Sequence, residues 1–266
     1  MNRVRSSGDT LLRIDLNADL GEWDADDDAA AAARHAALDA ALMDAVSSVN
    51  VACGGHAGDA GSMRLTVRAA AVRGLAIGAH PSYPDRARFG REPVALDGDR
   101  LEREVARQVA TLAEIAAGEG TRLAHVKPHG ALYHRAAIDP SVATTVAAAV
   151  AAVDRALVVV ARSGGALLEA ASRAGLATAS EVFCDRAYEA DGGLVPRGTE
   201  GAILSDPLAA ASRVLAMLRD GRVAARDGAP VRVEPDTACV HGDSPGAADF
   251  ARRLRAELEA AGVVVD

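Results

Sequence analysis

Short runs of alternating apolar and polar residues recur along the chain, separated by longer stretches with helical spacing. In the first run, residues 11–17, Leu or Ile at positions 12, 14 and 16 alternates with Arg, Asp and Asn. This period of two is typical of a strand with one buried face. Residues 156–161 are apolar throughout, as in a parallel strand that is covered on both faces.

Seven strands are predicted in this way, with helices between most of them. The strands are 11–17, 48–53, 75–79, 122–129, 156–161, 177–185 and 237–241, and the helices are 29–46, 62–73, 98–118, 140–153, 165–174, 207–220 and a last one that Ser244 and Pro245 begin. Residues 222–234 are predicted to form a β-hairpin around an Asp-Gly turn. Alternating strands and helices indicate a parallel α/β sheet, either closed or doubly wound. We favour a (β/α) barrel of about seven strands, because polar groups end nearly every strand and catalytic groups of barrels gather there.

Composition and charge narrow the class of protein. A chain of 266 residues suits one barrel, so we expect a single domain over 11–266 after a disordered leader at 1–10. The net charge of −8 and the pI of about 5.4 argue against nucleic-acid binding. No apolar run reaches the roughly 18 residues of a membrane span, so no membrane association is expected. Three widely spaced cysteines, an odd number, predict reduced thiols and a cytoplasmic protein.

Lys127 is the only lysine in the chain, whereas every other strong cation is arginine. It lies in the run His125-Val126-Lys127-Pro128-His129, where strand alternation places His125, Lys127 and His129 on one face. Such a face must line a polar cavity rather than an apolar core. The alternative for Lys127 is a structural ion pair.

Other rare residues also fall at predicted strand ends. Two of the three asparagines, Asn17 and Asn50, lie on strands, and all three tyrosines, among them Tyr83 and Tyr133, follow strands. Because parallel strands end at one mouth, we expect polar side chains from all of them to converge. The converging set is Asp15, Asn17, Asp19, His56, His80, Lys127, His129, Asp185, Arg186, His241 and Asp243.

Two kinds of chemistry are open to this set. Asp15 with His56 and His80 is a candidate triad for a divalent metal, because a carboxylate and imidazoles suit zinc, iron or nickel. Alternatively, His129 or His241, paired with Asp185 or Asp243, could perform acid–base catalysis. Lys127 and Arg186 could stabilise an oxyanion or a phosphoryl group. A P-loop motif is absent from the sequence, and Cys53 is interpreted as a buried thiol rather than a nucleophile.

Six blocks, in order along the chain, resemble the LamB/YcsF family, the A subunit of bacterial ATP-dependent 5-oxoprolinase. They are Asp15-Leu16-Asn17-Ala18-Asp19-Leu20-Gly21-Glu22, Asn50-Val51-Ala52-Cys53-Gly54-Gly55-His56-Ala57-Gly58-Asp59, Gly78-Ala79-His80-Pro81-Ser82-Tyr83-Pro84-Asp85, Val126-Lys127-Pro128-His129-Gly130-Ala131-Leu132-Tyr133, Asp185-Arg186-Ala187-Tyr188 and Val240-His241-Gly242-Asp243. The resemblance implies a barrel related to sugar deacetylases. It also implies cleavage of 5-oxoproline to L-glutamate, coupled to hydrolysis of ATP as co-substrate, in complex with the B and C subunits.

Roles for individual residues follow as expectations from the motifs and the resemblance together. Catalytic roles are assigned to Asp15, Lys127, His129, Asp185, Arg186 and His241, substrate binding to Asn17, Asp19, Asn50, His80, Tyr83, Tyr133 and Asp243, and a possible divalent metal to Asp15, His56 and His80. Three positions depart from the family pattern: Gly55 replaces a usual Phe, Trp23 a usual Gly, and His134 a usual Asn. Either the aromatic side chain has moved from position 55 to position 23 across the barrel mouth, or this protein binds its substrate differently. The alternatives are a metal-dependent amide or sugar deacetylase and a non-catalytic subunit that binds 5-oxoproline.

Overall fold

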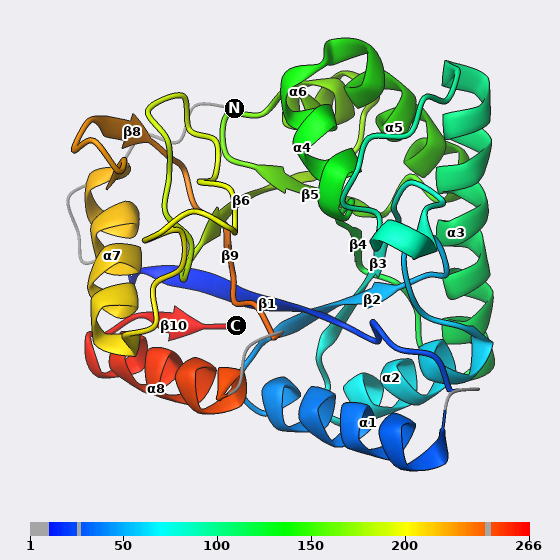
Figure 1. Cartoon of the computed structure of the whole chain (residues 1–266), viewed down its shortest axis with the longest axis horizontal. Helices are drawn as coiled ribbons and strands as arrows, with labels where there is room; N and C mark the ends of the chain where they lie inside the picture. Colours follow the sequence, from blue (N-terminus) through cyan, green and yellow to red (C-terminus); the bar gives the residue numbers. More distant parts are fainter. Residues whose placement is uncertain (1–10, 26–27, 243–245) are drawn as a thin grey trace.

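Seven parallel strands close into a barrel in the computed structural model, which describes residues 11–25, 28–242 and 246–266 (Figure 1). In order around the barrel they are β1 (Arg13–Leu20), β2 (Ser48–Ala52), β3 (Ala76–His80), β4 (His125–Val126), β5 (Val158–Arg162), β6 (Thr178–Phe183) and β9 (Thr237–Cys239). The closing pair joins β9 to β1, with Asp15 opposite Thr237 and Asn17 opposite Cys239. The predicted barrel is therefore confirmed. The expected leader at 1–10, Asp243 and the helix start at Ser244 and Pro245 lie outside the described residues.

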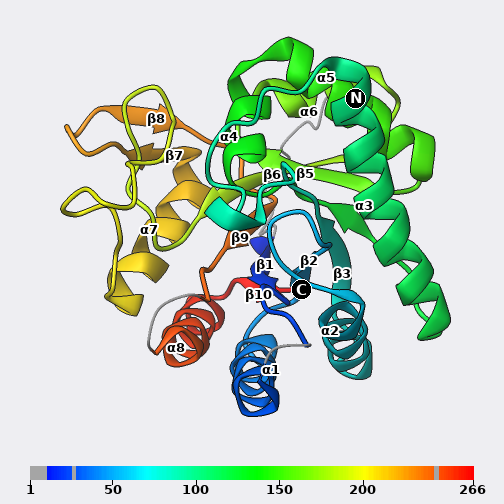
Figure 2. The same ribbon diagram turned by 45° about the vertical axis from the view of Figure 1, so that its right-hand side comes forward.

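Helices cover the outside of the barrel, as the alternating pattern predicts. They are α1 (Ala29–Met43), α2 (Ala60–Val72), α3 (Gly98–Gly118), α5 (Pro140–Val153), α6 (Ala166–Arg173), α7 (Pro207–Asp220) and α8 (Ala247–Ala260). Figure 2 shows α8, α1 and α2 side by side around β1, β2 and β3. Several begin at an aspartate whose carboxylate accepts a backbone N–H, as Asp59 does at α2 and Asp97 at α3.

Some elements were not predicted. Helix α4 (Gly130–Ile138) begins directly after His129, so β4 is much shorter than the predicted strand 122–129. A short strand, β10 (Val264–Val265), pairs with the start of β1, and a 3₁₀ turn, η1 (Arg86–Arg88), lies in the loop after β3. The predicted hairpin is confirmed as β7 (Arg222–Ala224) paired antiparallel with β8 (Pro230–Arg232).

The two faces of β1 show how the sequence builds both the core and the site. Ile14, Leu16 and Ala18 are buried in the apolar core, whereas the intervening polar side chains contact groups from other strands. Barrel interiors are usually filled by branched apolar residues, but this interior is polar. A Cβ atom at Gly78 would lie 2.1 Å from the His125 ring, so only glycine on β3 leaves room for that imidazole.

No single helix in the described ranges is long and apolar enough to cross a membrane, although the bent pair α4 and α5 reaches that length and composition together. All three cysteines are buried and free. Burial raises the pKa of Cys53 to about 12, which supports its interpretation as an inert thiol.

Candidate active site

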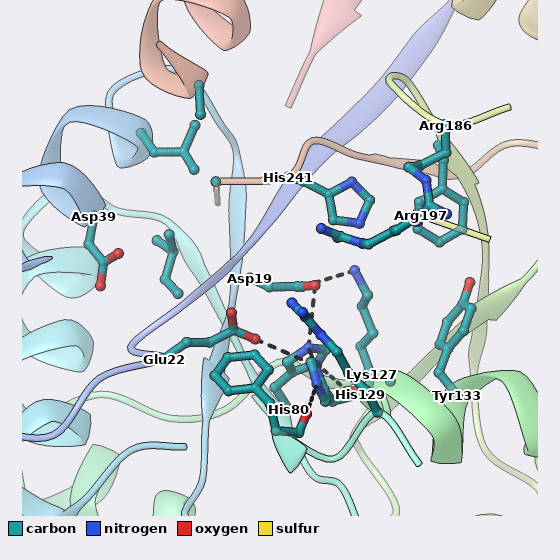
Figure 3. A pocket seen from close by; sticks show the side chains of 18 of the residues that line it. Asp19, Glu22, Asp39, His80, Lys127, His129, Tyr133, Arg186, Arg197 and His241 are labelled. Carbon is teal, nitrogen blue, oxygen red and sulfur yellow. Dashed lines mark hydrogen bonds and ion pairs between the residues drawn. The ribbon is translucent and has the colours of Figure 1, made fainter. Parts of the chain in front are cut away.

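A cavity of about 1140 Å³ opens where the strands end, as expected for a barrel enzyme (Figure 3). The chain segments that follow β1, β3, β4, β6 and β9 all contribute side chains to its wall. The residues that line the cavity include Asp19, Glu22, Trp23, His80, Phe89, Arg91, Lys127, His129, Tyr133, His134, Arg186, Arg197 and His241.

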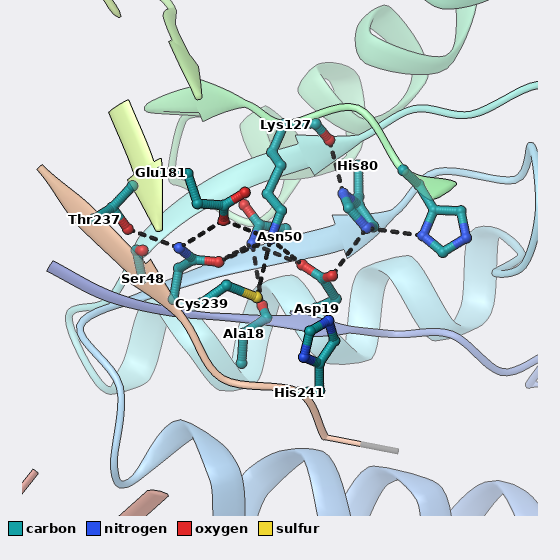
Figure 4. A network of polar contacts seen from close by, with 12 residues as sticks. Ala18, Asp19, Ser48, Asn50, His80, Lys127, Glu181, Thr237, Cys239 and His241 are labelled. Carbon is teal, nitrogen blue, oxygen red and sulfur yellow. Dashed lines mark hydrogen bonds and ion pairs between the residues drawn. The ribbon is translucent and has the colours of Figure 1, made fainter. Parts of the chain in front are cut away.

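Lys127 lies on the floor of this cavity and is almost fully buried (Figure 4). Its Nζ is 2.8 Å from Glu181 Oε1 and 3.0 Å from Asp19 Oδ1. It also lies 3.0 Å from Asn17 Oδ1 and 3.2 Å from Cys239 Sγ. Burial lowers the pKa of Lys127, but Asp19, Cys239 and Glu181 together outweigh it and hold the value well above the usual range. The ammonium therefore stays charged, and its three hydrogens already have acceptors.

A layer of amides below Lys127 extends the same network across the barrel. Asn50 Nδ2 donates to Asn17 Oδ1 at 2.8 Å and to Asp19 Oδ1 at 2.9 Å. Asn17 Nδ2 in turn donates to Glu181 Oε1 at 3.0 Å, and His125 Nε2 lies 2.8 Å from Asn50 Oδ1. These contacts place Asn17 and Asn50 beneath the cavity, where they hold charged groups rather than line the wall.

Asp15 is not brought to the mouth, so its predicted place in a metal triad with His56 and His80 is wrong. Its carboxylate accepts from Ser47 Oγ at 2.7 Å, from Ser48 Oγ at 2.8 Å and from Thr237 Oγ1. It points to the same side of β1 as Asp19, but four residues along a strand correspond to about 13 Å. Strand periodicity gives the face of the barrel correctly and leaves the depth undetermined.

Glu22 occupies the place that the sequence assigned to Asp15. One donor atom from each of Glu22, His56, His80 and His129 lies within 4.8 Å of all the others. Glu22 Oε1 is 3.2 Å from His56 Nε2 and 3.4 Å from His129 Nδ1. His129 Nδ1 is 3.1 Å from His80 Nε2. We refer to these four residues as the histidine cluster.

The three imidazoles of the histidine cluster are buried, and His80 adjoins Asp19, which links the cluster to the Lys127 network. The His56 and His129 rings are stacked with centroids 3.7 Å apart, and His80 Nε2 is 3.3 Å from Asp19 Oδ2. Burial, followed by the neighbouring histidines, lowers the pKa of His129 to about 2, and burial also holds the pKa of His56 well below its usual range. Burial raises the pKa of Asp19, but His80 and Lys127 reverse the shift and hold it well below the usual value. Asp19 is therefore ionised.

His241 and Asp185 form a separate pair on the other side of the cavity. Both carboxylate oxygens of Asp185 lie close to His241 Nδ1, at 2.9 and 3.0 Å. Because a carboxylate only accepts, Nδ1 carries the hydrogen and Nε2 keeps its lone pair. Burial raises the pKa of Asp185, but His241 outweighs it, and the net shift is downward. The Phe183 ring lies nearly parallel to the imidazole, with the ring centroids 5.8 Å apart.

Cationic and phenolic groups complete the wall. Arg91, Arg186 and Arg197 line the cavity, and one Arg186 nitrogen donates to the Val195 carbonyl at 2.6 Å. Figure 3 shows Arg186, Arg197, His241 and Tyr133 around the same space. The buried Tyr133 hydroxyl makes no well-formed hydrogen bond among the described residues, and burial followed by the Glu181 charge raises its pKa well above the usual value.

Of the predicted substrate-binding residues, Asp19, His80 and Tyr133 line the cavity. Tyr83 instead packs in the hydrophobic core, 3% exposed, and is not among the residues that line the cavity. Sequence reasoning missed Glu22 and Glu181 as site residues. Glu22 stands in one of the six quoted blocks, and Glu181 alternates with Phe183 and Asp185 along β6 and the residues after it, so a signal for each was available.

The three departures from the family pattern fall in different surroundings. Trp23 lines the cavity and donates its Nε1 hydrogen to Asp39 Oδ2 at 2.9 Å, and His134 also lines it. Gly55 is tightly packed, since a Cβ atom there would lie 2.4 Å from Gln108 Oε1 and 2.5 Å from Ser82 Oγ. An aromatic side chain at position 55 would therefore require a rearrangement of both neighbours.

Comparison with known proteins agrees with the resemblance in the motifs. The model of the LamB/YcsF family matches residues 14–266. A protein of Methylococcus capsulatus, named as the A subunit of 5-oxoprolinase, is 49% identical over 256 residues, which cover 95% of this chain and 94% of that protein. A protein of Heliobacterium modesticaldum with the same name is 45% identical, covering 96% and 97% of the two chains.

Solved structures give the same result for the fold. The crystal structure of a lactam utilization protein from Thermus thermophilus matches with a TM-score of 0.84 and 41% identity, covering 96% of this chain and 99% of that one. A putative cellobiose-phosphate cleavage protein from Enterococcus faecalis matches with a TM-score of 0.53 at 13% identity, covering 97% of both chains, which supports a shared fold alone.

Proposed function

Because the chain belongs to the LamB/YcsF family, we propose that it is the A subunit of an ATP-dependent 5-oxoprolinase. It would open the lactam of 5-oxoproline to L-glutamate while ATP is hydrolysed to ADP and phosphate. Its relatives that are named as the A subunit of 5-oxoprolinase, aligned over nearly their full length, support this role. That name implies further subunits, and we propose the B and C subunits as partners in the cytoplasm.

The chemistry of the lactam explains why ATP is needed. A five-membered lactam is unstrained and resonance-stabilised, so water attacks it slowly. Phosphorylation of the amide oxygen gives an imidate-like intermediate whose carbon accepts water. Breaking the C–N bond then gives γ-glutamyl phosphate, and its hydrolysis releases glutamate and phosphate.

The observation that carries the proposal is the His241–Asp185 pair beside a cavity with a cationic wall. Asp185 accepts the Nδ1 hydrogen, so His241 Nε2 can remove a proton from water. Arg186, Arg91 and Arg197 would bind the carboxylate of 5-oxoproline and the phosphoryl group, because guanidinium groups match both. The Tyr133 hydroxyl would donate to the substrate.

Lys127 receives a different role from the one first expected. With Glu181, Asp19 and Asn17 already around its ammonium, it has no hydrogen left for a phosphoryl group. We propose that it positions Asp19 at the cavity floor. Asp15, tied to three hydroxyl groups far from the mouth, has no place in the reaction.

The test is release of glutamate from 5-oxoproline, measured with and without ATP and with and without the B and C subunits. We expect release only with ATP and all three subunits, and loss of release in His241→Gln. Release by this chain without ATP would instead favour a metal-dependent amide hydrolase, the second candidate, which the histidine cluster supports. Full activity of the complex with His241→Gln would overturn the proposed base.

A further inference from the structure

We propose that Glu22, His56, His80 and His129 bind one divalent transition-metal ion of the zinc type. This site goes beyond the proposed function, and its test needs neither 5-oxoproline nor ATP. The four residues come from the ends of β1, β2, β3 and β4 or the segments that follow them, so the barrel assembles them at one mouth.

The hydrogen bonds of His80 and His129 place two lone pairs face to face. His80 Nδ1 lies 2.7 Å from the backbone oxygen of Lys127, and His129 Nε2 lies 3.0 Å from that of Phe89. A carbonyl oxygen only accepts, so each of these nitrogens carries the ring hydrogen. In the neutral rings, His80 Nε2 and His129 Nδ1 therefore both present lone pairs 3.1 Å apart, and His80 Nε2 also lies 3.3 Å from Asp19 Oδ2. A cation between them removes the repulsion.

A proton held between His80, His129 and Asp19 is the alternative to a metal ion, and the titration described below distinguishes the two. The exposed fractions are 2% for His56, 1% for His80 and 8% for His129. An imidazolium ion at this depth loses most of its hydration. A metal ion needs neutral imidazoles as ligands.

Three of the six separations between the donor atoms match the edges of a coordination tetrahedron, and all six are within 4.8 Å. With metal–nitrogen bonds of 2.0–2.1 Å, neighbouring ligands of a tetrahedral zinc ion lie about 3.3 Å apart. The three short separations among Glu22, His56, His80 and His129 are 3.1, 3.2 and 3.4 Å. Three imidazoles with one carboxylate form a donor set that suits zinc, cobalt or iron.

The backbone around the histidine cluster is arranged for these rings. The carbonyls that orient His80 and His129 act as the outer-shell partners usual for metal-bound histidine. Gly90 closes over the cluster with φ of +61°, and a Cβ atom there would lie 2.9 Å from His56 Cβ. Phe89 packs its ring edge-on against His56 and His129. A larger residue at position 90 would displace the rings.

The carboxylates nearby favour a cation, while Arg86 and Arg91 act on His56 in the opposite sense. Lys127 is paired with both Glu181 and Asp19, so the inner network is already negative by one charge. Glu22 adds another and has the most exposed side chain of the four ligands. An ion here would lie in the cavity wall, where a metal can polarise a substrate oxygen.

The experiment is titration of the chelator-treated full chain with Co²⁺, followed by visible absorption and calorimetry, and by competition with Zn²⁺. We expect one equivalent of Co²⁺ with the intense ligand-field bands of tetrahedral coordination. His129→Gln should weaken binding at least about tenfold, and His35→Gln, a matched histidine variant in α1 outside the cluster, should bind like the wild type.

Glu22→Gln is the second variant, because Glu22 lies in a loop and its loss does not disturb the barrel interior. Circular dichroism verifies that each variant is folded. Absence of stoichiometric Co²⁺ or Zn²⁺ binding by the wild type would overturn the site, and so would wild-type affinity in folded His129→Gln or Glu22→Gln. Failure of the 5-oxoprolinase assay leaves this result untouched, since no substrate is present.

Discussion

The Lys127 network and the histidine cluster share one barrel mouth and meet at Asp19, but they differ in how their hydrogen bonds are satisfied. Around Lys127, donors from an ammonium and two amides point to carboxylate and carbonyl oxygens of Asp19, Glu181 and Asn17 (Figure 4). In the histidine cluster, ring nitrogens of His80 and His129 face each other at 3.1 Å, beside the carboxylates of Glu22 and Asp19. In the first set the Lys127 ammonium has all its acceptors within the chain, whereas the second set is where we propose a metal ion.

This difference separates positioning from binding. A buried charge network that is internally matched holds its members rigidly and has little capacity left for a ligand. Burying several acceptor atoms that face one another costs free energy unless a cation or a proton lies between them. The lone lysine, the strongest signal in the sequence, therefore belongs to the framework, whereas the proposed metal site lies beside it.

The largest effect is expected for Lys127→Met. The change leaves Glu181, which is fully buried, and Asp19 without their shared cation. Breaking a buried ion pair on one side costs about 3–5 kcal/mol, so we expect a loss of that size in the free energy of unfolding together with loss of activity. Urea denaturation measures the first and glutamate release the second.

The matched control is the double variant Lys127→Met and Glu181→Gln, which removes one buried negative charge as well. It should recover part of the stability without recovering activity. If Lys127→Met unfolds at the wild-type urea concentration, the ammonium does not hold the network together.

The sequence allowed most of the fold to be predicted, because strand alternation and helix caps are local signals. It placed His125 and Lys127 correctly on the inner face, and all seven barrel strands were found. It failed in the depth of Asp15, since periodicity distinguishes faces but not layers. Glu22 was missed because it follows the end of β1, where no period applies. The orientation of the His129 ring depends on the loop after β3, where the Phe89 carbonyl contacts His129 Nε2. No local sequence pattern encodes this contact.

A smaller effect is expected for Asp185→Asn. This variant tests the His241–Asp185 pair, which belongs neither to the Lys127 network nor to the histidine cluster. The amide can donate to Nδ1 and so favour the wrong tautomer of His241, while the size of the side chain is unchanged. We expect kcat for glutamate release to fall by about 10²–10⁴-fold, as for a lost general base, with KM nearly unchanged. Steady-state kinetics of the complex measure both constants.

Asp44→Asn, in an exposed ion pair with Arg73, is the matched control and should keep wild-type kinetics. A fall confined to KM in Asp185→Asn would assign the pair to substrate binding. Unchanged kcat and KM would remove His241 and Asp185 from the reaction altogether.

The smallest effect concerns His125, a histidine that belongs to the matched network. Burial lowers its pKa from 6.5 to about 4, with Lys127 adding to the shift and Asp15 opposing it. Between pH 6.5 and 4 the unfolded chain therefore takes up a proton that the folded state refuses. The neutral His125 ring makes its full contribution to the free energy of unfolding above pH 6.5. This contribution declines by about 1.4 kcal/mol per pH unit as the pH falls from 6.5 toward 4.

His125→Gln keeps a donor for Asn50 but cannot titrate, so it should lose about 2 kcal/mol less stability than the wild type between about pH 7 and pH 5. Urea denaturation of both proteins at the two pH values measures this difference. His35→Gln, exposed in α1, should follow the wild-type dependence. Parallel curves for wild type and His125→Gln would mean that His125 takes up its proton in the folded barrel. The network would then tolerate a second cation beside Lys127, and the contrast with the histidine cluster would have to be drawn from geometry alone.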